Sequence, residues 1–202
     1  PFVIPQLAEG QPTTKALSED AAHFLIRTVR QHSNEVTIYA GGPMTNLALA
    51  TSIDPDFPKL AKELVFMGGS FSPHTRDAEF VNNPRHEFNF WFDPEAAQIV
   101  LRAPWKKMIC TSADISVKTR LTPSMIKEIE AAGTPAAGYV ARFYTPGPGA
   151  DYMWDELAAA AWIDPTLITK RETRYMGVDL SRGAGYGNTL TWNEKDLAKF
   201  SA

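Results

Sequence analysis

The sequence is poor in the features that mark several classes of protein. Its single cysteine, Cys110, excludes an internal disulfide, and with no histidine close in sequence it is expected to be an inert core thiol rather than a nucleophile. No apolar run approaches the ~20 residues that span a bilayer. The net charge of −3 gives no electrostatic footprint for nucleic acid. We expect a soluble protein without nucleic-acid or membrane partners, and the compartment, cytoplasmic or secreted, stays open.

The sequence does contain an alternation of short apolar strands with helical segments. Strands are expected at 36–40, 64–67 and 107–111, and helices at 18–32, 45–52, 93–101, 122–132 and after Asp155. Ser18 is the expected N-cap of the first helix, and Asp93, followed by Pro94, that of the third. Residues 70–86 are expected to form a polar loop, and 173–192 two strands around several glycines.

This alternation predicts a single α/β domain over residues 1–202, with a Rossmann-like, open, mostly parallel sheet and helices on both faces. In such sheets ligands bind at the carboxyl ends of the strands. Gly41-Gly42, Gly68-Gly69 and the turn at 111–116 all follow expected strands. We expect the glycines there to let the backbone approach a ligand closely.

Two acidic motifs indicate chemistry on a sugar. Asp155 stands at the mouth of an apolar, Ala-rich helix, directly after an aromatic residue, which suits it to hold a hard cation and a sugar hydroxyl together. Glu87 and Asn89 alternate with Phe88 and Phe90. We therefore expect the two polar side chains to share one face of an extended segment.

Four blocks resemble, in order and spacing, the nucleoside hydrolases of the inosine–uridine-preferring type. They are Tyr39-Ala40-Gly41-Gly42-Pro43-Met44-Thr45-Asn46-Leu47-Ala48-Leu49-Ala50, Val65-Phe66-Met67-Gly68-Gly69, Glu87-Phe88-Asn89 with Asp93-Pro94-Glu95-Ala96-Ala97, and Trp154-Asp155. The similarity runs from about Ala22 to about Leu190 and corresponds to the C-terminal two-thirds of the family. The resemblance implies the nucleoside hydrolase type of α/β fold, without its N-terminal strands. It also implies an N-glycosidase that splits ribonucleosides into base and ribose, as in purine salvage, around a bound Ca²⁺.

The resemblance assigns roles to individual residues. Asp155 matches the family's late aspartate, which ligates calcium and touches a ribose hydroxyl, so it is the expected catalytic and metal-binding residue. Gly41 occupies the position whose backbone carbonyl joins the calcium shell. Glu87 and Asn89 resemble the residues that grip the ribose hydroxyls, and Met67 resembles a methionine that lines the ribose pocket.

Further roles concern the loop before Glu87 and the leaving base. The family has an asparagine earlier in this loop, and Asn82 or Asn83 is the candidate, with a slight preference for Asn83. Trp154 stands where many members have a proton-donating histidine, as in the purine-specific branch, so we expect an indole that stacks on a purine. His74 and His86 lie on the same loop as alternative proton donors, although neither matches a family position.

The main departure from the family is the lack of the aspartate cluster that supplies most of its calcium shell and its general base; residues 1–40 contain nothing like it. The chain alone is not expected to turn over nucleosides. Either it is a fragment, or another chain supplies the acids, or the fold has lost its chemistry. Asp20, Asp77 and Glu79 stay open as substitutes. A sheet without its first strands should expose an edge, so we expect either an open edge or contact with another chain, a homo-oligomer included.

Two other functional classes remain open at this point. One is a non-catalytic remnant of the fold that binds nucleosides or sugars without releasing the base. The other is a dinucleotide-binding domain of similar architecture, which would need Gly-x-Gly-x-x-Gly after a strand. Gly41-Gly42-Pro43 does not match that motif. The hydrolase and the sugar-binding remnant are therefore the main hypotheses.

Overall fold

The centre of the molecule is a three-stranded parallel sheet. The computed structural model describes residues 13–72, 78–144 and 152–196. Within these, β1 (Thr37–Ala40), β2 (Glu63–Met67) and β3 (Met108–Thr111) are hydrogen-bonded in the order β1-β2-β3. In the described part of the chain β1 pairs with β2 alone, so its outer edge is open. This is one of the two arrangements expected for a sheet without its first strands.

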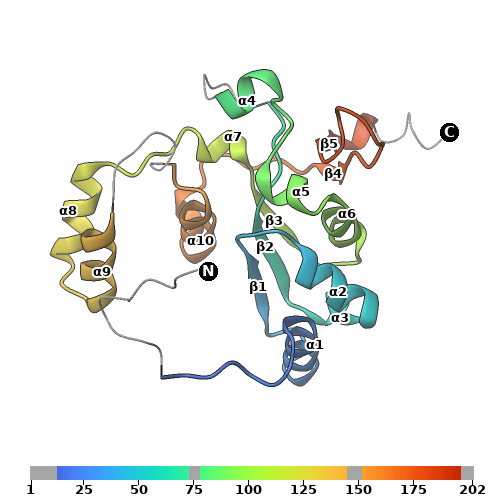
Figure 1. Cartoon of the computed structure of the whole chain (residues 1–202), viewed down its shortest axis with the longest axis horizontal. Helices are drawn as coiled ribbons and strands as arrows, with labels where there is room; N and C mark the ends of the chain where they lie inside the picture. The colour runs from blue at the N-terminus through green and yellow to red at the C-terminus, as the bar shows by residue number, and fades with distance from the viewer. Residues whose placement is uncertain (1–12, 73–77, 145–151, 197–202) are drawn as a thin grey trace, which may run out of the picture.

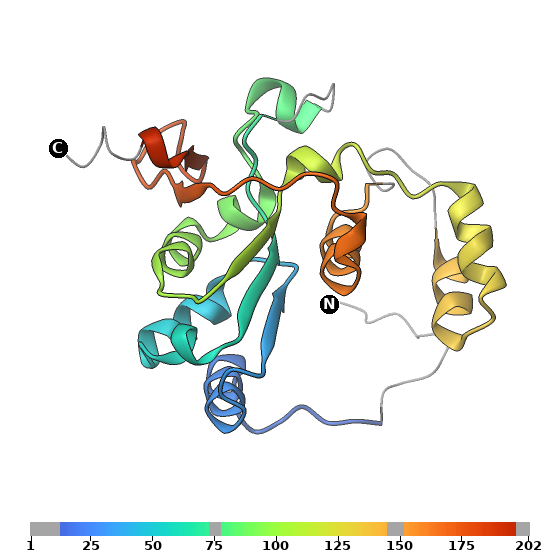
Figure 2. The same cartoon turned by 180° about the vertical axis from the view of Figure 1, so that it is seen from behind.

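Helices cover both faces of this sheet, as the sequence predicts. One face carries α1 (Ala21–Gln31), α2 (Thr45–Ile53), α3 (Phe57–Leu60) and α6 (Pro94–Arg102), and the other carries α10 (Asp155–Ile163) (Figures 1 and 2). The side chains of β2 alternate accordingly. Leu64 and Phe66 join the core beneath the first group of helices, whereas Met67 packs in the cluster that contains Ala158 of α10.

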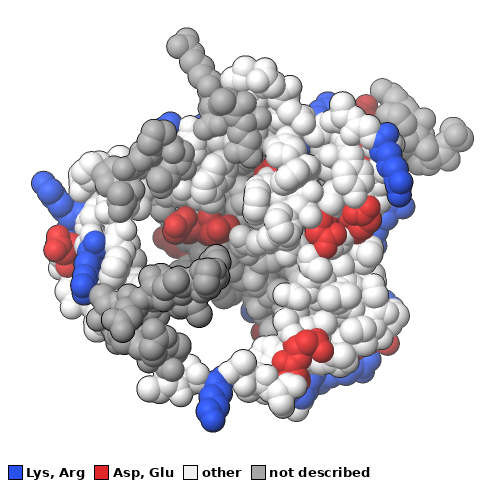
Figure 3. All heavy atoms as spheres, in the orientation of Figure 1, with Lys and Arg blue, Asp and Glu red and all other residues white. Residues whose placement is uncertain are grey.

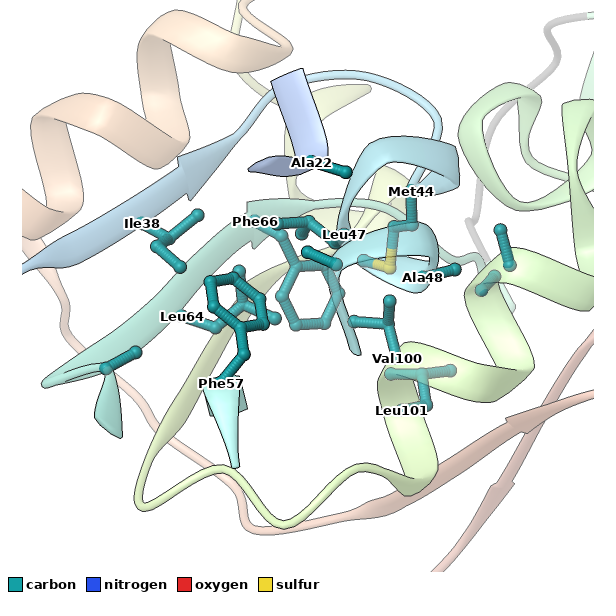
Figure 4. Packing of buried hydrophobic residues seen from close by; sticks show 14 of the residues in the cluster. Ala22, Ile38, Met44, Leu47, Ala48, Phe57, Leu64, Phe66, Val100 and Leu101 are labelled. Atoms are coloured by element: carbon teal, nitrogen blue, oxygen red, sulfur yellow. The ribbon is translucent and has the colours of Figure 1, made fainter. Parts of the chain in front are cut away.

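The larger core lies between the sheet and the helices of the first face. Figure 4 shows Phe57, Leu64, Phe66 and Val100 filling this layer, and each of the four is at most 1% exposed. Burial of one such side chain stabilises a fold by about 1.5–3 kcal/mol relative to exposure. This layer therefore fixes the position of the strands and, with them, of the loops at their carboxyl ends.

The remaining elements surround this core. They are α4 (Ala78–Asn82), α5 (Phe88–Phe92), α7 (Ala113–Ser116), α8 (Pro123–Ala131), α9 (Pro135–Phe143), the 3₁₀ turn η1 (Pro165–Leu167), and the antiparallel pair β4 (Tyr175–Val178) and β5 (Thr189–Trp192). Helices α8 and α9 pack on each other, on the far side of α10 from the sheet (Figure 1). Across the described ranges, the structure has no helix with the length and apolar character needed to traverse a bilayer.

Several local predictions are confirmed and others are wrong. Asp93 caps α6 by accepting a hydrogen bond from the amide of Ala96, as expected. The N-cap of α1 is Asp20 rather than Ser18, because the Asp20 carboxylate accepts from the amide and the ring of His23. The expected loop at 70–86 contains the helical turn α4, and a helix at 135–143 was not predicted.

The extended segment predicted for residues 87–90 is wrong in its backbone. Glu87 itself is extended, but its carboxylate caps the helix α5, which begins at Phe88. Alternation of polar and aromatic residues over four positions fits a strand, but a capping carboxylate followed by apolar residues also starts a helix. Glu87 and Asn89 are nevertheless both buried, at 3% and 7% exposure.

At the opposite end of the sheet a buried carboxylate ties three strands to α10. Glu63 of β2 accepts from the hydroxyl of Thr37 at 3.1 Å, from the ammonium of Lys107 at 2.7 Å and from the indole of Trp162 at 3.0 Å. The Lys107 contact, followed by the bonds from Trp162 and Thr37, lowers the pKa of Glu63 although burial opposes the shift. This cluster anchors the C-terminal end of α10.

The cluster predicts a stability difference that depends on pH. Glu63→Gln should lower the free energy of unfolding at pH 7 by about 1–3 kcal/mol, because it removes charge-assisted hydrogen bonds. A carboxyl whose pKa is depressed by folding stabilises the fold above its unfolded pKa, about 4.5, and this stabilisation is lost as the pH falls through the lower folded value. Urea unfolding should therefore show the gap between the two proteins closing below about pH 4.5.

The matched control is Glu172→Gln. Glu172 also pairs with cations, Lys170 and Arg174, but it does so on the surface. Surface ion pairs contribute little, so this variant should unfold almost as the unmodified chain does. A Glu63→Gln gap that persists unchanged at acid pH would contradict the assignment.

Candidate functional site

A cavity of about 560 Å³ opens at the carboxyl ends of β1 and β2. Its volume falls within the roughly 300–1,000 Å³ typical of small-molecule sites. Its walls are formed by Gly41, Gly42, Pro43, Met67, Phe80, Glu87, Phe88, Asn89, Tyr152, Trp154 and Asp155. The positions predicted for the sugar and the cation thus converge on one hollow, although they come from four separate blocks of the sequence.

Asp155 is the first residue of α10 and carries the most exceptional atom of the cavity. Its Oδ1 is buried without a hydrogen-bond partner in the described structure. Burial, and to a lesser extent the nearby Glu156, raises the pKa of Asp155. Figure 3 shows acidic side chains gathered over α10 on this face, while Lys and Arg lie mostly around the outline. A desolvated, unpaired carboxylate oxygen is a group that a cation or a hydroxyl donor would satisfy.

Two residues of the β1 region hold Asp155 in place. The hydroxyl of Tyr39 donates to the Asp155 backbone carbonyl at 2.6 Å. A methyl group at Gly41 would lie 3.1 Å from both Cγ and Oδ1 of Asp155, so the glycine provides the space for the carboxylate. Burial, followed by the charges of Asp155 and Glu156, raises the pKa of Tyr39 to about 12, so its hydroxyl stays a proton donor at neutral pH.

The glycines after β2 serve a different purpose from the expected one. A methyl group at Gly68 would lie 2.7 Å from the ring of Phe90, and one at Gly69, where φ is +76°, would meet Met176, Phe90 and Thr189. These neighbours are protein side chains of the fold itself. Gly68-Gly69 therefore lets α5 and the β4–β5 pair pack against the end of β2.

Glu87 presents a carboxylate fixed by backbone donors. Its Oε1 accepts from the amide of Asn89 at 2.9 Å, and its Oε2 accepts from the amides of Gly69 at 2.9 Å and Phe90 at 3.1 Å. Three N–H donors favour the ionised form of a carboxylate. Glu87 is thus both the structural cap of α5 and a rigid acceptor in the wall of the cavity.

Asn89 and Met67 are linked behind the same wall. The Asn89 side-chain nitrogen donates to the Met67 carbonyl at 3.1 Å and lies 3.5 Å from the Met67 sulfur. Met67 is 2% exposed and belongs to the smaller core cluster as well as to the cavity wall. The amide is therefore held by its nitrogen end, which fixes its orientation toward the cavity.

Another part of the cavity wall is aromatic rather than polar, and the sequence did not predict most of it. The Trp154 ring lies 5.4 Å from that of Tyr152 and 6.4 Å from that of Phe80. Arg120 lies 4.3 Å from the centre of the Tyr152 ring and donates to its hydroxyl at 2.8 Å. Tyr152 and Phe88 stand within two residues of predicted site positions, whereas Phe80 lies in the segment predicted as a loop and carried no signal.

Other predicted candidates lie elsewhere in the described structure. Asn82 ends α4 in an exposed position, the backbone carbonyl of Asn83 accepts from the amide of His86, and neither residue contributes to the cavity wall. The His86 ring lies 5.1 Å from that of Trp91, and the carboxylate of Asp20 is used in capping α1. His74, Asp77 and the side chain of Glu79 fall outside the described residues. The roles of the asparagines and histidines stay predictions.

The residues present fit part of a calcium site. The Asp155 carboxylate beside Gly41 supplies oxygen donors of the kind Ca²⁺ takes, and the unpartnered Oδ1 is consistent with a ligand atom. A calcium ion takes six to eight oxygens. In the described ranges no three His, Cys, Asp or Glu side chains gather in a way that could hold a metal. The described cavity therefore supplies one side of such a shell.

Comparison with known proteins matches this architecture. The family model for inosine-uridine preferring nucleoside hydrolases matches residues 5–201. The inosine-uridine preferring nucleoside hydrolase of Leishmania major is 31% identical over 88% of this chain and 56% of its own length. The pyrimidine-specific ribonucleoside hydrolase of Escherichia coli is 28% identical over 88% of this chain and 57% of its own length. The purine-preferring ribonucleoside hydrolase of Gardnerella vaginalis superposes with a TM-score of 0.74 at 29% identity, covering 93% of this chain and 60% of that one.

The chain thus spans just over half the length of these relatives. The matched region includes every block that forms the cavity, and the superposition supports the α/β nucleoside hydrolase fold with its parallel sheet. On this evidence the chain belongs to the inosine-uridine preferring nucleoside hydrolase family.

Proposed function

We propose that this protein hydrolyses the N-glycosidic bond of ribonucleosides, with a preference for purine nucleosides, and releases base and ribose. The observation that carries the proposal is the buried, unpartnered Oδ1 of Asp155 in a cavity with a polar side and an aromatic side. A nucleoside has the same division, a hydroxyl-rich ring joined to a flat aromatic base. The family of the chain supports this reaction class.

The polar side of the cavity suits the ribose. Glu87 and Asn89 are buried and oriented by bonds to the backbone. The Glu87 carboxylate can therefore accept from sugar hydroxyls, and the Asn89 amide can bond them, without first becoming ordered. Cleavage develops positive charge on the sugar ring, as in glycoside hydrolysis. The negative charges of Glu87 and Asp155 stand where they can stabilise that charge in a low-dielectric wall.

Asp155 and Gly41 are the residues that would hold Ca²⁺, the ion the family typically binds. Bound there, the ion would engage the ribose diol and lower the pKa of an attacking water. The chain's own contribution is to hold the Asp155 carboxylate beside Gly41 with its Oδ1 buried. The further acids of the shell, and the general base, come in this proposal from outside the described residues, on a preceding segment or on a second chain of a complex.

The aromatic side suits the base. Trp154 contacts the rings of both Phe80 and Tyr152, and these contacts limit rotation of the indole. Stacking of a base on an aromatic side chain contributes about 1–3 kcal/mol. A purine presents a larger face than a pyrimidine, so this wall supports the purine preference.

A second candidate function is a module that binds nucleosides without cleaving them. One observation favours it: both carboxylate oxygens of Glu87 are used to cap α5, so Asp155 has the one buried carboxylate oxygen left without a partner among the described residues. A single such group can bind a sugar hydroxyl. The two functions differ in one measurable event, the release of free base.

Release of hypoxanthine from inosine tests the main proposal. The protein, joined to any segment that completes it, should release the base in the presence of CaCl₂, and a chelator should abolish the release. Asp155→Asn should lower kcat/KM by about 100-fold or more, because it removes charge from the transition state. Binding of inosine without base release under all conditions would leave only the binding module.

The control for this variant is Asp164→Asn. Asp164 lies just beyond the other end of α10, where it is exposed and caps the turn η1 through Thr166. The same chemical change there should leave inosine turnover unaltered. Equal losses in the two variants would show that Asp155 acts through the fold rather than through the substrate.

Replacement of Trp154 tests the purine preference. Trp154→Ala should weaken inosine binding by about 10-fold, while uridine binding should change less, because the smaller base loses less stacking area. Trp154→Phe should retain most of the inosine affinity, since it keeps an aromatic face. Isothermal titration with both nucleosides gives the ratio, and an equal effect on the two would contradict base stacking by Trp154.

Gly41 and Gly42 form a matched pair for testing the carboxylate position. Gly41→Ala places a methyl group 3.1 Å from Asp155 Cγ, whereas a methyl group at Gly42 meets no atom within 4 Å. Gly41→Ala should therefore displace the carboxylate and weaken inosine binding by about 10-fold, an effect of roughly 1.4 kcal/mol. Gly42→Ala should have a much smaller effect. The opposite order would place the ligand away from Asp155.

A further inference from the structure

Helix α10 packs on the sheet with a surface made mostly of alanine. The helix reads Asp155-Glu156-Leu157-Ala158-Ala159-Ala160-Ala161-Trp162-Ile163, and Ala158 is its one buried residue. Alanines give a shallow surface with no large side chain to lock a helix along its axis. The helix packs on β2 and β3, and its start, which carries Asp155, is joined to β1 by a hydrogen bond from Tyr39.

Two polar tethers instead attach the ends of α10 to the sheet. At the start, the Tyr39 hydroxyl of β1 donates to the Asp155 carbonyl at 2.6 Å. At the end, the Trp162 indole donates to Glu63 at 3.0 Å. Seven residues separate the two attachment points, a distance of about 10 Å along an α-helix. Both tethers are single hydrogen bonds donated by an aromatic side chain, but only the Tyr39 bond lies beside the cavity.

Tyr39 is placed for this contact by strand alternation. Ile38 points into the large core, so Tyr39 points to the opposite face of the sheet, where α10 lies. The Tyr39 residue is 40% exposed, so burial of its ring is incomplete. Its ring also borders Gly41, because a methyl group there would lie 3.4 Å from Tyr39 Cε1 and 3.1 Å from Asp155 Oδ1. Tyr39, Gly41 and Asp155 thus form one three-way contact.

We propose that Tyr39 is a positioning residue that holds the first turn of α10, and so the Asp155 carboxylate, in register with Gly41 for ligand binding. This inference rests on the proposed function for its consequence, but its structural part can be measured separately. Tyr39 acts through the Asp155 backbone and has no assigned contact with the sugar or the base.

The test compares Tyr39→Phe with Trp162→Phe in the full chain. Tyr39→Phe removes the hydroxyl that donates to the Asp155 carbonyl, and Trp162→Phe removes the indole N–H that donates to Glu63. Both variants keep an aromatic ring. Amide hydrogen exchange of α10 is the first readout, since the Ala159 amide pairs with the Asp155 carbonyl in a regular helix. Tyr39→Phe should speed exchange in the first turn about fivefold and leave the last turn unchanged, whereas Trp162→Phe should do the reverse.

Inosine binding in the presence of CaCl₂ is the second readout. Tyr39→Phe should weaken inosine binding about five- to tenfold, as expected when one hydrogen bond of ordinary strength is lost near the ligand. Trp162→Phe should leave inosine binding within about twofold of the unmodified chain, because its hydrogen bond lies farther from the cavity. Thermal unfolding of both variants checks that each is folded. A merely structural tether would lower affinity equally in the two.

The outcomes separate the two ideas. Unchanged exchange in the first turn of Tyr39→Phe, or equal loss of inosine affinity in both variants, overturns the positioning role. A third outcome is faster exchange in the first turn of Tyr39→Phe together with no inosine binding by the unmodified chain. This outcome supports the hydrogen-bond tether but contradicts the proposed function.

Discussion

The site depends on one constraint, the burial of the Asp155 Oδ1 oxygen at the start of α10. An unsatisfied buried polar atom costs about 1–3 kcal/mol of stability, and more when it is charged. In the described part of the chain no donor offsets this cost, because the nearby Tyr39 hydroxyl bonds the Asp155 backbone carbonyl and Oδ1 stays without a partner. Helix N-termini favour negative charge, which offsets part of it. The remaining cost is recovered when a cation or a hydroxyl donor satisfies the oxygen, so it favours binding of such a ligand.

The two carboxylates of the cavity illustrate different solutions to the same problem. Glu87 is more deeply buried, yet three backbone amides satisfy its oxygens, so it is a permanent part of the fold. Asp155 has no such donors at Oδ1, and its environment raises the pKa. A group whose charge the fold stabilises can shape a pocket, whereas a group whose charge the fold opposes can take part in recognition of a cation.

Local sequence signals predicted the elements of the fold but not the contacts between them. Asp93 before Pro94 marked a helix start correctly, because a cap acts within three residues. The helix at Glu87 was missed although its cap is also local, at the amides of Asn89 and Phe90, because the polar–aromatic alternation there fits a strand as well. The third bond to Glu87, from the Gly69 amide 18 residues earlier, has no local signal. The bond from Tyr39 to Asp155 joins residues 116 positions apart, and no local pattern carries it. The convergence of Glu87, Asn89 and Asp155 followed from the order of four family motifs rather than from periodicity.

The division of polar groups also limits what the described cavity can do alone. Catalysis requires stronger binding of the transition state than of the nucleoside. In the proposed reaction the base changes little during cleavage, so an aromatic wall that stacks on it would contribute mainly to ground-state affinity. In the proposed reaction, the carboxylates of the cavity wall that would respond to an oxocarbenium ion are Glu87, already engaged by three amides, and Asp155. Glu156 lies near Asp155, but in the described ranges no three His, Cys, Asp or Glu side chains gather to hold a cation. Under the proposed function, affinity for nucleosides and the ability to cleave them would therefore reside in separable parts of the site: the first in the walls of the described cavity, the second in the further acids that the proposal places outside the described residues.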